Sequence, residues 1–90
     1  MTKEKVNPAE STQELEERQK DLILYNDEVN TFDFVIETLM DVCGHELMQA
    51  EQCALITHLN GKCAVKSGTF DELKPPCDEM TNRKLTVEIY

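Results

Sequence analysis

The chain has 90 residues, with 18 aspartates and glutamates against 9 lysines and arginines, and a formal net charge of −9. This length suits one small domain, and the acidic balance argues against binding of nucleic-acid phosphates. No stretch approaches the ~20 apolar residues of a membrane span, and no signal-peptide pattern opens the chain, so we expect a cytoplasmic protein with no membrane contact.

The first 20 residues differ in composition from the remainder. Residues 1–20 contain few apolar side chains and a run of charges between Glu14 and Lys20, in which Leu15 is the single apolar member. A segment of this kind buries too little apolar surface to offset its conformational entropy. We therefore expect a flexible N-terminal extension over residues 1–20 and one folded domain over residues 21–90.

The most informative stretch lies where the folded part begins. Leu22-Ile-Leu-Tyr25 is a short apolar run followed by Asn26-Asp27-Glu28. This pattern predicts a buried strand over residues 21–26 that ends in a turn. Carboxylate and amide groups at the end of a strand, next to a helix start, are suited to hold a small cationic group.

A helix is predicted directly after this turn. Asn30 is a favourable N-cap, with Asp33 three residues on in the position of a capping box. Apolar residues then recur at helical spacing up to Gly44, which can end a helix in the left-handed conformation. These features predict a helix over residues 31–43.

The next helix is predicted over about residues 46–59. Its start lacks a strong N-cap, and Asn60-Gly61 ends it. The segment Cys53-Ala-Leu-Ile56 is apolar on all sides, so we expect this helix to be buried between two layers of the fold.

A short strand and a third helix follow. Residues 62–66 read as the strand, and Thr69 with Glu72 forms a capping box that opens the helix. Pro75-Pro76 removes two amide donors, so we expect this helix to kink or restart there before ending near residue 82.

The last element completes the predicted fold. Apolar and polar residues alternate over residues 85–90, which is typical of a strand. The order β-α-α-β-α-β indicates an α+β protein. We expect a two-layer sandwich with a three-stranded, at least partly antiparallel sheet covered by helices on one face.

The cysteines, histidines and carboxylates could serve two further classes of function, an enzyme and a zinc module. We expect the four cysteines to be reduced and packed as small apolar side chains. An enzyme would need Cys or His chemistry, or Asp27 and Glu28 as acid and base, but the chain has no phosphate loop and no nucleophile elbow. The alternative to a binding protein is a zinc module, although no close ligand pair recurs. Its candidate ligands are Cys43, His45, Cys53, His58, Cys63 and Cys77.

Three segments resemble the ClpS adaptor family. Leu24-Tyr-Asn-Asp-Glu-Val-Asn-Thr-Phe-Asp-Phe-Val35 is similar to the strand, Asn-Asp-Asp/Glu motif and Phe-Val helix of that family. Gln52-Cys-Ala-Leu-Ile-Thr-His58 and Asn60-Gly-Lys62 resemble its histidine-ended helix and Gly-Lys turn. The resemblance covers roughly residues 21–90 in element order. It implies a ClpS-like adaptor domain there.

The resemblance also implies a function. ClpS-like proteins bind the first residue of proteins that carry N-degrons and deliver them to a Clp AAA+ unfoldase and its peptidase, without catalysis of their own. The implied partners are N-degron proteins and the N-terminal domain of the unfoldase. We expect a monomer with no cofactor, no metal and no nucleic acid.

The resemblance assigns site residues as well. Asn26, Asp27 and a neutral His58 are implied to contact or surround the free α-amine, which is a cation with three donors. Because a protonated histidine would repel that cation, we expect binding to weaken below about pH 6.5. The walls of the implied side-chain pocket are Leu24, Asn30, Phe32, Val35, Ala54, Thr57 and Leu85.

Three of these positions depart from the family's common pattern. Phe32 stands where a gatekeeping methionine is common, Ala54 replaces another methionine, and Asn30 replaces a threonine. We expect the larger and smaller side chains to offset each other in volume. The pocket should then still accept Leu, Phe, Tyr or Trp, in an order that the family pattern does not give.

Overall fold

The structure is a computed structural model that describes residues 18–90. Most of the predicted N-terminal extension therefore lies outside the described residues, although Lys20 already belongs to the first strand. The elements are β1 (Lys20–Tyr25), α2 (Phe32–Cys43), α3 (Leu47–Asn60), β2 (Lys62–Gly68), α4 (Phe70–Asn82) and β3 (Thr86–Ile89).

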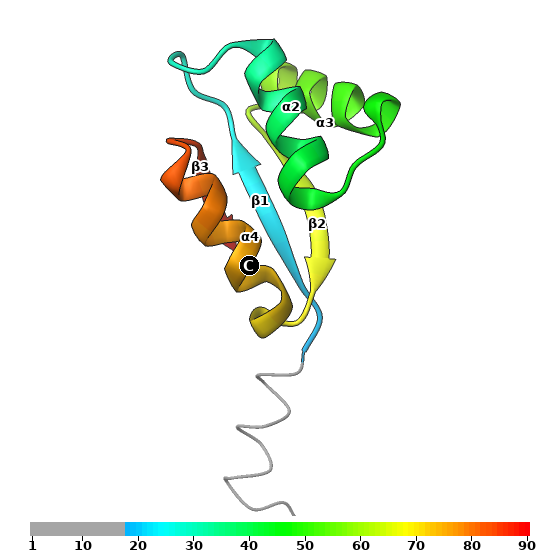
Figure 1. Ribbon diagram of the computed structural model, residues 1–90, viewed down its shortest axis with the longest axis vertical. Coiled ribbons are helices and arrows are strands. Elements are labelled where there is room, and N and C mark those ends of the chain that lie inside the picture. Colours follow the sequence, from blue (N-terminus) through cyan, green and yellow to red (C-terminus); the bar gives the residue numbers. More distant parts are fainter. Residues whose placement is uncertain (1–17) are drawn as a thin grey trace, which may run out of the picture.

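The first strand lies at the centre of the sheet. β1 pairs antiparallel with β2 on one side and with β3 on the other, so the strand order is β2-β1-β3 (Figure 1). Leu22 and Leu24 alternate along β1 and are buried, with 0% and 1% of their surface exposed, because they point toward the helices. The predicted element order and the α+β class are confirmed.

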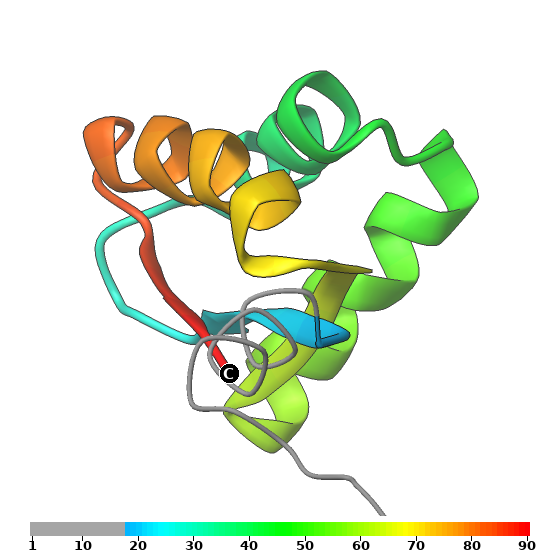
Figure 2. The same cartoon turned by 90° about the horizontal axis from the view of Figure 1, so that it is seen from below.

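The three helices contact different parts of the sheet. Seen from below, α2 and α4 lie over one face of the sheet, while α3 runs beside β2 (Figure 2). Leu39 of α2 and Leu73 and Met80 of α4 are fully buried between these helices and the sheet. Leu24 of β1 and Ala50 of α3 belong to the same core, which holds these two elements in place with respect to each other.

The prediction that α3 is buried between two layers is wrong. Met48, Leu55 and Leu59 expose 73%, 48% and 69% of their surface. The reason is that α3 packs mainly against β2 and α2, on one side only. Ala50, Ala54 and Thr57 make up the buried side of the helix.

The starts of α3 and α4 agree with the prediction from their capping residues, but the predicted break in α4 is absent. As expected, Glu46 precedes α3 without a side-chain cap, and the capping box of Thr69 and Glu72 opens α4. Helix α4 does not restart at Pro75-Pro76 but runs from Phe70 to Asn82. Each of the two prolines inside the helix costs about 3 kcal/mol, and burial of Leu73 and Met80, at ~1.5–3 kcal/mol each, offsets much of the combined cost.

Candidate functional site

A cavity of ≈ 390 Å³ lies where the end of β1, the β1–α2 loop and the last turns of α3 meet. We call it the β1–α3 cavity. This volume lies within the ~300–1,000 Å³ of small-ligand sites. Every residue predicted for the site lies in its lining, although these residues come from several separate elements. The lining consists of Leu24, Tyr25, Asn26, Asp27, Glu28, Asn30, Phe32, Val35, Ala54, Thr57, His58 and Leu85.

The carboxylate of Asp27 organises the loop at one end of the cavity. Its Oδ1 accepts hydrogen bonds from the backbone N–H groups of Val29 and Asn30, both at 2.9 Å. Its Oδ2 accepts a third, also at 2.9 Å, from the side-chain amide of Asn30. The local sequence therefore forms an Asx turn, a conformation that aspartate favours. Asp27 places a fixed negative charge beside the cavity.

These hydrogen bonds lower the pKa of Asp27. Burial alone would raise it, but the bonds from Asn30 and Val29 outweigh that effect. A carboxyl group whose pKa is lower in the folded state stabilises the protein above its unfolded pKa, near ~3.9, and this stabilisation is lost as the pH falls through the folded pKa.

An acid titration should therefore reveal the contribution of Asp27. We expect the difference in thermal midpoint between the wild type and Asp27→Asn to shrink as the pH falls from 5 toward 2.5. Circular dichroism melts across that range measure it. Glu28→Gln is the matched control, because it removes the same charge from the neighbouring residue. A constant difference between the wild type and Asp27→Asn would contradict the role of the Asp27 carboxylate.

Asn26 and His58 supply further polar side chains at the Asp27 end of the β1–α3 cavity. The backbone N–H of Asn26 donates to the carbonyl oxygen of Gly61 at 2.9 Å, which joins the end of β1 to the turn after α3. Gly61 has φ 95, where a side chain would be strained, so glycine suits this turn. His58 lies in the last turn of α3, exposed at the rim of the cavity. Asn26 and His58, from distant parts of the chain, thus both line the β1–α3 cavity.

The other end of the cavity has apolar walls. Leu24, Ala54 and Leu85 expose only 1%, 3% and 5% of their surface, so they belong to the core and to the cavity at once. Thr57 is also buried, and its hydroxyl donates to the carbonyl oxygen of Cys53 at 2.8 Å. Phe32, at 44% exposed, is the most open of these apolar residues. An apolar side chain that enters here would meet carbon on most sides.

Asn30 is part of the frame of the cavity and not the N-cap of α2. The N-cap is Thr31, whose hydroxyl accepts the N–H of Phe34 at 3.1 Å. The side-chain amide of Asn30 donates instead to Asp27 and, at 3.0 Å, to the carbonyl oxygen of Lys84. The sequence prediction of an Asn30 cap is wrong because this amide finds acceptors in two other segments. It closes the loop before α2 against the segment before β3.

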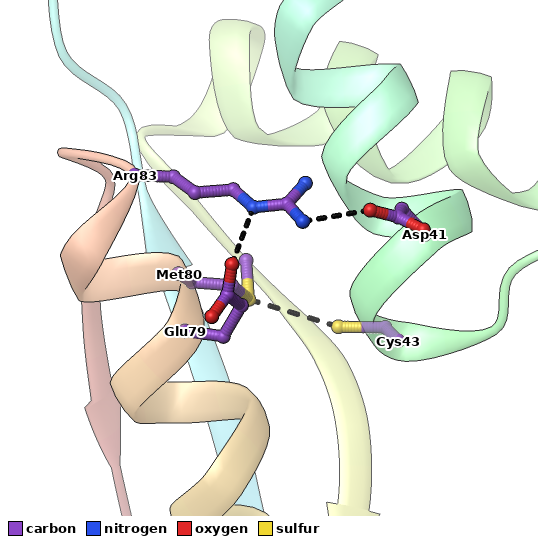
Figure 3. Close-up of polar contacts among 5 residues, drawn as sticks. All are labelled: Asp41, Cys43, Glu79, Met80 and Arg83. Atoms are coloured by element: carbon purple, nitrogen blue, oxygen red, sulfur yellow. Dashed lines mark hydrogen bonds and ion pairs between the residues drawn. The ribbon is translucent and has the colours of Figure 1, made fainter.

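The segment that receives Asn30 is held in place by Arg83, at the end of α4 (Figure 3). Its guanidinium donates to Glu79 of the same helix at 2.8 Å and to Asp41 of α2 at 2.7 Å. The next residue, Lys84, has a positive φ of 72. Exposed ion pairs contribute only ~0–1 kcal/mol, so we regard Arg83 chiefly as fixing the position of the Lys84 carbonyl.

A sulfur contact lies below this ion pair in the same view. The thiol of Cys43 lies 3.7 Å from the sulfur of Met80, between α2 and α4 (Figure 3). Burial raises the pKa of Cys43 to about 11. The prediction that the cysteines pack in the core holds fully only for Cys43, since the other three cysteines are half-buried.

Two lining residues were not predicted from the sequence. Tyr25 and Glu28 adjoin predicted residues in the chain, and this adjacency was the available signal. The hydroxyl of Tyr25 donates to Glu88 of β3 at 2.8 Å, and this bond, together with burial and the charge of Glu88, raises the pKa of Tyr25 to about 12. Tyr25 therefore stays neutral at physiological pH. Glu28 adds a second carboxylate to the polar end.

The residues proposed for a zinc module do not gather. Among residues 18–90, no group of three or more His, Cys, Asp or Glu side chains is arranged to hold a metal ion. His45 is buried, and its Nε2 lies 2.6 Å from the carbonyl oxygen of Val65. That ring nitrogen is therefore engaged with the backbone. In the described part of the chain, no helix is long and apolar enough to cross a membrane.

In residues 18–90, the fold and the cavity define a small α+β domain with a cavity that is polar at one end and apolar at the other. The family model for the ATP-dependent Clp protease adaptor protein ClpS matches residues 15–88. The chain therefore belongs to the ClpS family, as the sequence resemblance predicted. The family is one of adaptors, which confirms the prediction that the protein is not an enzyme.

Relatives agree with this assignment. The chain is 42% identical over 57 residues to the ATP-dependent Clp protease adapter protein ClpS of Campylobacter jejuni subsp. jejuni strain 81-176, and equally to that of subsp. doylei. These matches cover 63% of this chain and 59% of each relative.

A solved structure has a similar fold. It is that of Agrobacterium tumefaciens ClpS2 bound to L-phenylalaninamide, with a TM-score of 0.69 and 18% identity. The match covers 80% of this chain and 94% of that one. At this level of identity it supports the fold alone.

Proposed function

We propose that this protein binds the free α-amine and the bulky apolar first side chain of N-degron proteins and delivers them to a Clp AAA+ unfoldase and its peptidase. The observation that carries the proposal is the β1–α3 cavity, which joins hydrogen-bond acceptors to apolar walls. Family membership supports the delivery step, with the N-terminal domain of the unfoldase as docking partner and a cytoplasmic monomer as the active form.

The polar end of the cavity suits an α-ammonium group. Both oxygens of Asp27 already accept hydrogen bonds from the loop, so its main part is to supply negative charge and to fix the loop. The direct acceptors are then the side-chain carbonyl of Asn26 and a ring nitrogen of His58. Hydrogen bonds to a charged group contribute ~1.5–3 kcal/mol each. Two such bonds already distinguish a free terminus from an internal residue.

The apolar end suits the first side chain. Burying a leucine or phenylalanine side chain contributes a further ~1.5–3 kcal/mol. These terms, less the costs of association, agree with roughly micromolar affinity. L-phenylalaninamide, the ligand of the Agrobacterium ClpS2 structure, carries both a free α-amine and a benzyl side chain. A ligand of this chemistry would meet both ends of the cavity at once.

A panel of peptides that differ only in the first residue tests the proposal. We expect peptides that begin with Leu, Phe, Tyr or Trp to bind about 10–100-fold more tightly than one that begins with Ser, because only the former bury an apolar side chain. Fluorescence anisotropy gives the dissociation constants. Equal affinity across the panel would contradict the proposed pocket.

Phe32 is proposed to select among these side chains. It is the partly exposed aromatic residue of the lining, and a β-branched first residue such as Ile is bulky and stiff close to its backbone. We expect Phe32→Ala to reduce the preference for Phe over Ile at least about threefold, since it widens the cavity. Phe70→Ala is the matched control, because Phe70 is 41% exposed and lies on α4, outside the lining. An unchanged ratio in Phe32→Ala would rule out this role.

The pH dependence of binding tests His58. A neutral imidazole can accept a hydrogen bond from the ammonium group, whereas an imidazolium repels it. We expect the affinity for a Phe peptide to fall between pH 7.5 and 5.5, and to change less in His58→Gln. Calorimetric titrations at each pH measure the effect. Parallel profiles for the wild type and His58→Gln would argue against His58 as an acceptor.

A further inference from the structure

Two cysteines face each other across the contact between α3 and β2. Cys63 lies opposite Leu24 in the pairing of β2 with β1, and residues opposite each other on neighbouring strands point to the same face. Leu24 is buried under the helices, so Cys63 also points to the helical side of the sheet. Cys53 lies on α3 one turn from the buried residues Ala50 and Thr57. Both cysteines are therefore placed on the surfaces by which α3 and β2 contact each other.

The two thiols also affect each other. Burial raises the pKa of Cys63 to about 11, and a hydrogen bond and charge repulsion from Cys53 act in the same direction. The thiol of Cys63 in addition lies 3.5 Å from the carbonyl oxygen of Ala64 as a donor. Cys63 therefore stays protonated near neutral pH.

We propose that Cys53 and Cys63 are a disulfide-forming pair that joins α3 to β2 by exchange with a small-molecule disulfide such as glutathione disulfide. One of the two cysteines, as its thiolate, attacks one sulfur of glutathione disulfide, the S–S bond of glutathione disulfide breaks, and one glutathione thiolate leaves. The other cysteine then loses its proton and attacks the mixed disulfide, which releases the second glutathione. The protein loses two protons and two electrons, and glutathione disulfide is reduced to two thiols.

The disulfide would link residues that lie next to two walls of the β1–α3 cavity. Ala54 directly follows Cys53, and Leu24 lies opposite Cys63 in the sheet. Both Ala54 and Leu24 are walls of the cavity. A disulfide requires Cα atoms within about 7 Å, so its formation fixes the spacing of these two walls. This inference goes beyond the proposed function and does not depend on it.

The test is oxidation of the folded full-length protein with glutathione disulfide at pH 8, followed by mass spectrometry without reduction. We expect a species lighter by about 2 Da, the mass of the two hydrogens lost, and proteolytic peptides in which Cys53 is linked to Cys63. The same reaction in 6 M urea should spread the linkage over several cysteine pairs. Dithiothreitol should restore the reduced mass.

Three variants separate this pair from the other thiols. Cys53→Ser and Cys63→Ser should each give a glutathione adduct and no internal disulfide, whereas Cys77→Ser should form the disulfide as the wild type does. Oxidation of the wild type should also raise its thermal midpoint, because the link restricts the unfolded chain. Stable glutathione adducts on Cys53 or Cys63 of the wild type, a different cysteine pair in the folded protein, or a lower midpoint would each overturn the proposal. Binding of Phe peptides to the reduced protein is measured separately, so failure here leaves the proposed function intact.

Discussion

A peptide that begins with a free phenylalanine is expected to bind at least about 100-fold more tightly than the same peptide with an acetylated amino terminus. Acetylation removes the positive charge and two of the three N–H donors. The acceptors of Asn26 and His58 in the β1–α3 cavity then lose a charged partner. Two charge-assisted hydrogen bonds at ~1.5 kcal/mol each correspond to about this factor.

The control for this experiment concerns general charge attraction. The protein carries a net charge of −9, so any cationic peptide gains some affinity that has nothing to do with a site. A second peptide should therefore keep its free terminus and carry an acetylated lysine side chain near its other end. We expect this change to weaken binding less than about threefold, since exposed charges are screened by salt. Equal losses from both acetylations would refute a dedicated site for the α-amine.

Asp27→Ala is expected to weaken binding of the free Phe peptide by at least about 30-fold. The change removes the acceptor of three hydrogen bonds in the β1–α2 loop, at ~0.5–1.5 kcal/mol each, together with the charge beside the ammonium group. The loop then no longer holds Asn26 and Asn30 in one arrangement. Anisotropy titrations of the purified variant, with a melting curve to show that it is folded, measure the loss.

Two companion variants divide this effect into its parts. Asp27→Asn keeps an oxygen that can accept the backbone N–H groups of Val29 and Asn30, but it removes the charge. Glu28→Gln removes one charge from the next residue of the same lining. We expect a loss from Asp27→Asn that is smaller than that from Asp27→Ala, and a loss from Glu28→Gln that is smaller still. If Glu28→Gln equals Asp27→Ala, the effect is one of net charge and the fixed loop has no special part.

The sequence predicted the elements well because their signals are local. The capping box of Thr69 and Glu72 needs only four residues, and it opens α4 as expected. The end of β1 at Asn26-Asp27 likewise follows from turn preferences of adjacent residues. The grouping of the site residues could not be predicted from local signals. It came from the resemblance to a family, since no local pattern brings His58 and Leu85 to the end of β1.

The errors occurred where distant parts of the chain decide. Asn30 and Thr31 are both good N-cap residues, and the choice between them depends on the carbonyl of Lys84, 54 residues away. The apolar segment of α3 could not show which of its sides would have a neighbour, and in the structure Leu55 and Ile56 are 48% and 41% exposed. Periodicity reports the composition of a helix surface, whereas burial depends on what packs against it.

The strand order β2-β1-β3 has a consequence for biosynthesis. β1 is made first of the strands but occupies the centre of the sheet, so it must wait for partners on both sides. Its second partner, β3, begins only at Thr86, and the cavity wall Leu85 directly precedes it. Until β3 has left the exit tunnel, one edge of β1 stays unpaired and open to other strands. We infer that the β1–α3 cavity is completed only after residues 85–89 have left the exit tunnel.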